Sequence, residues 1–179
     1  MPSPGRRPPL SKYLRMARAG GAIEAKVIPA RFVKTAEWVR LKCQFGCGGF
    51  NKRLSCPPYT PTPATTGKLL KEYRRAVIFT YEGSEDVRQR RRMQRLVVDI
   101  ERAAFLDGYY KALGLGAGPC RFCSVCNTGR RCRFPRLARP SMEACGIDVY
   151  ATCRNAGLTL EVVTSYDQTP KYVSLVLID

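Results

Sequence analysis

Four cysteines lie within thirteen residues of this chain, at Cys120, Cys123, Cys126 and Cys132. Two successive Cys-x2-Cys steps bring sulfurs together more readily than a hydrophobic core or a disulfide requires. In bacterial ferredoxins, three cysteines at such steps bind a cubane cluster. The run therefore predicts a [4Fe-4S] site, with Cys132 as its least regular ligand. Zinc is the alternative, although structural zinc sites pair two Cys-x2-Cys knuckles across a longer segment.

A second group, Cys43-x3-Cys47-x8-Cys56, supplies only three ligands. Cys145 or Cys153 could complete this site from a later helix, and the predicted ligand set includes Cys145. The two cysteines stand eight residues apart, which places them near one helical face, so both could instead be small core side chains. We interpret Cys153 in that way. Alternatively, the fourth iron of a cluster is open to water or substrate.

Histidine is absent from the sequence. This excludes zinc sites that use imidazole, haem ligation by histidine, and Ser-His or Cys-His nucleophile pairs. We therefore expect sulfur ligands. The odd number of cysteines, nine, and a start without the apolar run of a secretory signal favour the reducing cytoplasm. No stretch approaches the roughly 18 apolar residues that span a bilayer, so no membrane association is expected.

The chain carries 31 Lys and Arg against 14 Asp and Glu, a net charge of +17. An arginine-rich, solvated surface explains part of this excess. The arginines between Arg88 and Arg95 are interpreted as such a solvated helix face. The remaining explanations are an acidic redox partner protein, an anionic small molecule, or nucleic acid, although no recognised nucleic-acid motif is present.

The chain divides into a basic arm rich in Pro, Arg and Gly at 1–22, with a short helix at 10–19, and a single metal-binding domain at 23–179. Apolar and β-branched runs predict strands near 26–33, 75–82, 158–164 and 172–178. Helices are expected at 35–41, 67–73, 84–113 and 141–156, the third of them starting at Ser84. The fold class is α/β or α+β, with a small mixed sheet, flanking helices and two cysteine-rich loops at one end of the sheet.

Several segments together resemble a known family. They are Cys43-x3-Cys47-Gly48, Ser55-Cys56-Pro57-Pro58, Gly116-Ala-Gly-Pro-Cys120-x2-Cys-x2-Cys126, Cys132-Arg-Phe-Pro135 and Arg139-Pro-Ser-Met-Glu143-Ala-Cys-Gly146-Ile-Asp-Val149. The pattern is similar to the prokaryotic predicted metal-binding proteins grouped as domain of unknown function 2284, over about 25–179. The resemblance implies metal binding at two cysteine sites and names no reaction. Four polar residues of the last segment are interpreted as a structural helix-entry network: Arg139, Ser141, Glu143 and Asp148.

Three functions follow from these observations. The first is a cytoplasmic protein with one or two [4Fe-4S] clusters that transfers electrons or supports a partner enzyme. The second is an enzyme whose cluster on Cys43, Cys47 and Cys56 has an open iron and acts on a small anionic substrate, with Arg53 holding the anion and Tyr59 donating a proton. The third is a nucleic-acid-binding protein with structural metal sites.

Overall fold

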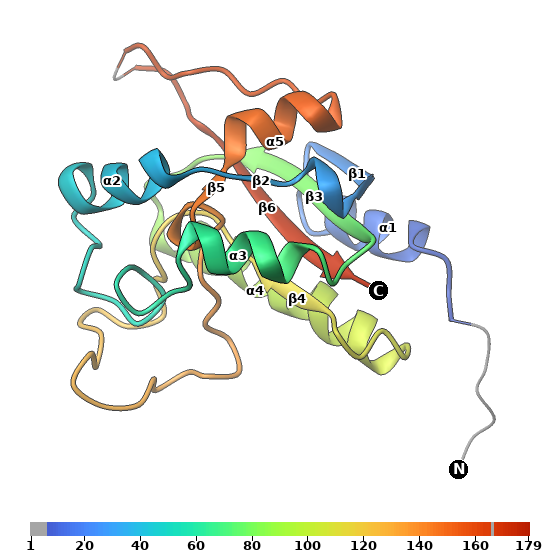
Figure 1. The fold of residues 1–179 in the computed structure, drawn as a ribbon, viewed down its shortest axis with the longest axis horizontal. Coiled ribbons are helices and arrows are strands. Elements are labelled where there is room, and N and C mark those ends of the chain that lie inside the picture. The colour runs from blue at the N-terminus through green and yellow to red at the C-terminus, as the bar shows by residue number, and fades with distance from the viewer. Residues whose placement is uncertain (1–6, 166) are drawn as a thin grey trace.

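A four-stranded antiparallel sheet runs through the middle of the protein (Figure 1). The structure, a computed structural model, describes residues 7–165 and 167–179. Within these residues no helix is long and apolar enough to cross a membrane. The elements in chain order are α1 (Ser11–Ala19), β1 (Glu24–Pro29), η1 (Ala30–Phe32), β2 (Lys34–Thr35), α2 (Glu37–Gly46), α3 (Pro63–Leu70), β3 (Arg75–Glu82), α4 (Val87–Leu106), β4 (Leu113–Leu115), η2 (Glu143–Cys145), β5 (Ile147–Asp148), α5 (Val149–Ala156) and β6 (Lys171–Ile178).

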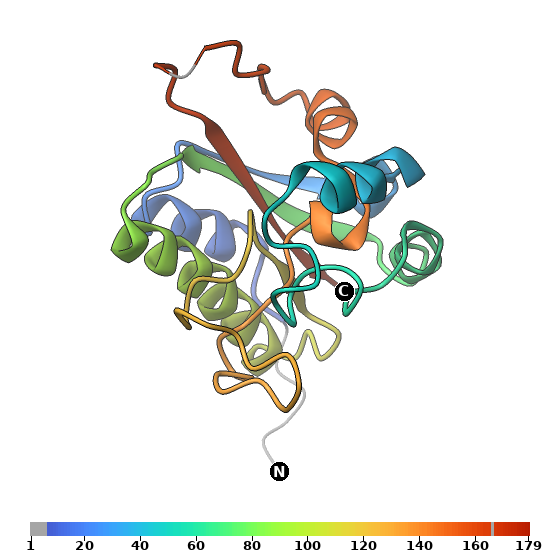
Figure 2. The same cartoon turned by 90° about the vertical axis from the view of Figure 1, so that its left-hand side faces the viewer.

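The sheet has the order β1-β3-β6-β4 and is covered on both faces. Side chains of the central strands alternate between two cores, because successive residues of a strand point to opposite faces. Val77 and Phe79 pack with α1 and α4, whereas Ala76 and Ile78 pack with α5 and the segment around η2. Figure 2 shows these layers on opposite sides of the sheet. The predicted α/β class, the number of strands and the flanking helices are confirmed. The sheet was expected to be mixed, but every strand pair in it is antiparallel.

The short helix expected at 10–19 is present as α1. Its Tyr13 and Ala17 are fully buried in the core shared with α4. Asp107, which follows α4, accepts hydrogen bonds from Lys12 Nζ at 2.6 Å and Tyr13 Oη at 2.7 Å. The described part of the predicted basic arm therefore packs against the sheet layer, while residues 1–6 of that arm lie outside the described residues.

Several predicted elements differ from the structure. The segment 158–164 forms no strand, and β4 at Leu113–Leu115 occupies the edge beside β6 instead. The long helix ends at Leu106 and begins after Asp86, whose side chain accepts from Arg88 N, so Ser84 is not its cap. The segment 141–156 is divided into η2, β5 and α5, with Gly146 at φ +74° between the first two.

Helix α2 starts after β2 and is longer than the predicted turn at 35–41. Its last turns contain Cys43, which was expected in a loop. The Arg40 guanidinium donates to the carbonyl oxygens of Thr60 and Pro61, at 3.2 and 2.6 Å. Thr60 in turn donates its hydroxyl hydrogen to the carbonyl oxygen of Ala144. The segment that contains Cys43, Cys47 and Cys56 comes first along the chain and is called the first cysteine segment below. These bonds hold its end to α2 and to η2.

Glu101 of α4 holds both ends of the second cysteine segment, which contains Cys120, Cys123, Cys126 and Cys132. Its Oε2 accepts from the Gly114 amide at 2.6 Å and from Arg139 Nε at 2.7 Å, and its Oε1 accepts from Arg139 Nη2 at 2.6 Å. Gly114 precedes the cysteines, and Arg139 follows them. The expected helix-entry network is thus present in part, because Ser141 Oγ accepts from Ala144 N and Asp148 caps α5.

We expect Glu101→Ala to lower the free energy of unfolding by roughly 2–3 kcal/mol, because it leaves a half-buried guanidinium and a backbone amide without their acceptor. Urea denaturation of the metal-free chain measures this. Glu85→Ala is the matched control, since Glu85 also pairs with an arginine of α4, Arg90, but its side chain is 93% exposed. We expect no measurable change for the control; equal losses in the two variants would contradict the role given to Glu101.

Candidate metal centres

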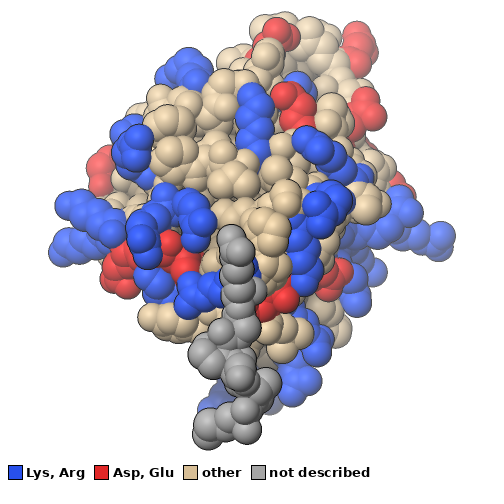
Figure 3. All heavy atoms as spheres, turned by 90° about the vertical axis from the view of Figure 1, so that its right-hand side faces the viewer, with Lys and Arg blue, Asp and Glu red and all other residues tan. Residues whose placement is uncertain are grey.

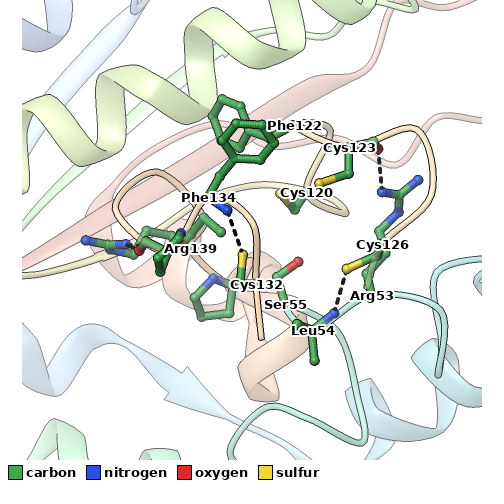
Figure 4. Close-up of a pocket in the computed structure, with 13 residues that line it drawn as sticks. Arg53, Leu54, Ser55, Cys120, Phe122, Cys123, Cys126, Cys132, Phe134 and Arg139 are labelled. Carbon is green, nitrogen blue, oxygen red and sulfur yellow. Dashed lines mark hydrogen bonds between the residues drawn. The ribbon is translucent and has the colours of Figure 1, made fainter. Parts of the chain in front are cut away.

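The four cysteines of the second segment line a single hollow of about 260 Å³. All four lie on the irregular stretch between β4 and η2, and all are half-buried. Figure 4 shows their sulfurs spread around the hollow, which Phe122 and Phe134 also line. The two rings lie with centroids 6.2 Å apart. The sequence prediction that these cysteines share one site therefore agrees with their placement.

Backbone amides point at the sulfurs of this hollow. Phe134 N donates to Cys132 Sγ and Leu54 N donates to Cys126 Sγ, both at 3.4 Å (Figure 4). Such bonds stabilise the negative charge of metal-bound sulfur. Leu54 belongs to the first cysteine segment. Its neighbour Arg53 donates to the carbonyl oxygen of Cys123 at 3.2 Å, so the two cysteine segments are joined directly.

Sequence reasoning missed the residue that holds Cys120 in place. Gln94 of α4 donates from Nε2 to the Pro119 carbonyl oxygen at 2.9 Å, and its Oε1 accepts from the Arg121 amide at 3.0 Å. The adjacent turn contributes Arg91, which donates to the Arg121 carbonyl oxygen at 2.7 Å. The available signal was the spacing of Gln94 and Glu101, which are seven residues apart and therefore share a helix face.

The first three cysteines line a second, larger cavity of about 690 Å³. Cys43 comes from α2, and Cys47 and Cys56 come from the irregular segment that follows α2. Much of the lining is apolar, and Glu143 and two lysines, Lys42 and Lys171, also contribute to it. The apolar part includes Trp38, Val39, Phe50, Leu160, Val162 and Val173.

Gly49 leaves room between two of these sulfurs. A Cβ atom at this position would lie 3.3 Å from Cys56 Sγ, 3.6 Å from Cys47 Sγ and 3.4 Å from Pro119 Cβ. The Gly49 amide donates to Cys47 Sγ at 3.4 Å. The missing side chain therefore brings two thiols and an amide together, and Pro119 places the second cysteine segment beside them. This arrangement fits a metal group bound by sulfur.

Burial disfavours the free thiolate at several of these cysteines. It raises the pKa of Cys56 to about 11, and neighbouring Cys47 adds to the shift. Burial also raises the pKa of Cys43, with Cys47 and Glu143 contributing, and the pKa of Cys120, where the Phe122 amide acts in the opposite direction. A positively charged metal group would supply the compensation that these sulfurs need as thiolates.

The structure does not bring Cys145 into the cavity with Cys43, Cys47 and Cys56. Cys145 is 3% exposed and packs in the core, as does Cys153. Burial raises the pKa of Cys145 to about 12. Within residues 7–165 and 167–179, no three Cys, Asp or Glu side chains converge as ligands of one metal ion.

The two residues expected to assist an open-site enzyme lie away from the larger cavity. Arg53 lines the four-cysteine hollow instead. Tyr59 is exposed, and its hydroxyl donates to Asn51 Oδ1 at 3.0 Å. Neither side chain lines the cavity of Cys43, Cys47 and Cys56. The cationic groups in that cavity are Lys42 and Lys171.

Comparison with known protein families places the chain in one of them. The family described as "Predicted metal-binding protein (DUF2284)" matches residues 26–178, and the chain belongs to this family. The match spans both cysteine segments and all of the sheet except the first two residues of β1. No curated protein and no solved structure matches the chain.

Gly49→Ala is expected to remove most of the metal bound at Cys43, Cys47 and Cys56, because the added methyl group enters the space between two sulfurs. Metal per chain, measured by mass spectrometry after anaerobic purification, tests this. Gly48→Ala is the control, since a Cβ there meets no atom within 4 Å. If Gly49→Ala folds normally by circular dichroism and binds as much metal as the unaltered protein, the space between the two sulfurs is not needed for metal binding.

Proposed function

We propose that this member of the predicted metal-binding family is a cytoplasmic iron-sulfur protein that transfers electrons to or from a partner. In this proposal each cysteine segment holds one [4Fe-4S] cluster. The first cluster is bound through Cys43, Cys47 and Cys56, and the second through Cys120, Cys123, Cys126 and Cys132.

The observation that supports the proposal best is the four-cysteine hollow. Four cysteines line a hollow of about 260 Å³, and backbone amides from two different segments donate to two of the sulfurs. A zinc ion would require all four sulfurs about 2.3 Å from one point. A cubane places its ligand sulfurs around a larger, multi-atom group and accepts amide hydrogen bonds at sulfur. The size of the hollow thus favours the cluster over zinc.

The contact between the two segments supports electron transfer. Leu54 donates to Cys126 Sγ, and Cys56 follows only two residues later in the same segment. Arg53 adds a hydrogen bond to the Cys123 carbonyl oxygen. Two clusters bound in this way would be linked by a short route through bonds and hydrogen bonds. Such a route suits the passage of electrons between them.

The charge around the second segment supports an acidic partner. Arg130, Arg131 and Arg133 are exposed on either side of Cys132. Exposed arginines near a cluster raise its reduction potential and steer a negatively charged protein toward it. Elsewhere, on the face shown in Figure 3, basic side chains are interspersed with acidic ones. The partner proposal therefore rests on the arginines of the cysteine segment.

The larger cavity favours a second candidate function, an enzyme acting on a small molecule. Cavities of several hundred Å³ with apolar walls and a few polar groups are typical ligand sites. Here three cysteines, two lysines (Lys42 and Lys171) and two glutamates (Glu143 and Glu161) contribute to such a cavity of about 690 Å³. The lysines are the groups that would meet an anionic substrate. A small molecule that changes the spectrum of the first cluster would favour this function over electron transfer.

Iron and sulfide analysis tests the proposed function. Anaerobically purified protein is expected to hold about eight irons and eight sulfides per chain. The double variant Cys123→Ala/Cys126→Ala should retain about four of each, and Cys43→Ala/Cys47→Ala should also retain about four. Cys153→Ala is the control and should keep the full content, because Cys153 is a core residue. Zinc without sulfide in the unaltered protein would contradict the proposal.

A further inference from the structure

The three-cysteine centre has three protein ligands, and Glu143 lies two residues before Cys145, the fourth ligand expected from the sequence. Glu143 lines the same cavity as Cys43, Cys47 and Cys56, whereas Cys145 does not. The Cys43 thiol also lies 3.8 Å from the carbonyl oxygen of Glu143 and points at it as a donor. Glu143 is therefore a direct neighbour of the cysteine site in space.

One oxygen of the Glu143 carboxylate has no partner. Its Oε2 atom is buried and forms no hydrogen bond, although part of the residue is accessible from the cavity. Among the described residues, no Lys or Arg forms an ion pair with this carboxylate. The guanidinium of Arg40 on α2 donates its hydrogen bonds to Thr60 and Pro61 instead. A buried carboxylate oxygen without a partner is costly unless the group is protonated or a cation binds it.

The backbone around Glu143 is held in place. Ser141 Oγ accepts from the Ala144 amide at 3.1 Å, and Gly146 O accepts from the Ala36 amide at 2.9 Å. Gly146 has φ +74°, and a Cβ atom there would overlap Pro63 of α3. A side chain on such a backbone is positioned before any ligand arrives. The unpartnered oxygen is thus a feature of a fixed segment.

We propose that the Glu143 carboxylate is the fourth protein ligand of the metal centre at Cys43, Cys47 and Cys56. The inference rests on the proposed function, since it requires metal at this site. Carboxylate oxygen is an ordinary ligand of zinc and iron, alone or beside thiolates. A carboxylate oxygen also binds soft metals that have sulfur ligands less firmly than a thiolate does. The iron held by Glu143 would be the exchangeable position of the cluster, and it would face the larger cavity.

The test compares anaerobically reconstituted variants by iron and sulfide content and by paramagnetic resonance. Glu143→Gln keeps the shape of the side chain and removes its charge. It should lose iron from the first centre, either one iron with the appearance of a three-iron signal or all four, while the second centre keeps its content. Glu143→Cys should restore a four-iron centre with an altered signal. Cys145→Ala is the matched control and should leave iron and signal unchanged.

Stability of the metal-free chain separates ligation from folding. Glu143→Gln should not lower it, because the substitution removes a buried carboxylate without a cation. Full iron with an unchanged signal in Glu143→Gln would overturn the inference, and loss of iron in Cys145→Ala instead would assign the ligand to Cys145. If the Cys43→Ala/Cys47→Ala variant binds as much metal as the unaltered protein, there is no metal centre at these cysteines. The proposed first centre then fails, and this inference fails with it.

Discussion

Both cysteine sites depend on side chains that satisfy the backbone of irregular segments. The chain between β4 and η2, and that between α2 and α3, form no sheet and little helix, so their amides and carbonyl groups need other partners. Gln94 and Glu101 provide them for the second segment, and Arg40 provides them for the first. Gln94 and Glu101 are on α4, which packs against the sheet, and Arg40 is on α2, which contacts η2 and α3. The two cysteine segments are therefore held by helices of the folded domain.

The two sites offer different surroundings to the groups they would bind. The four-cysteine hollow is small, receives amide hydrogen bonds and lies beside exposed arginines. The three-cysteine cavity is larger, mostly apolar, and includes the Glu143 carboxylate. Hydrogen bonds, charge and burial around a cluster set its reduction potential. With the proposed clusters bound, these surroundings would suit electron exchange at one centre and an exchangeable position at the other.

Strong local patterns were sufficient to predict the central strands and the cysteine groups. The apolar run at 76–81 is buried on both faces as β3, and the run Cys120–Cys132 lines one hollow. β4 was missed because three residues with a central glycine carry no alternating pattern. The segment 158–164 does carry one, but β4 takes the edge beside β6. The spacing of Gln94 and Glu101 shows only that they share a helix face. Their partners, and those of Glu143, lie on distant segments and could not be predicted from local spacing.

The central claim is that the four-cysteine hollow holds an iron-sulfur cluster. X-ray absorption at the iron and zinc edges of anaerobically purified Cys43→Ala/Cys47→Ala protein examines that hollow by itself. The account predicts iron with sulfur neighbours and a second shell of iron atoms, because a cubane contains several metals in contact with shared sulfide. Zinc surrounded by four sulfurs, with no metal in the second shell, would contradict it.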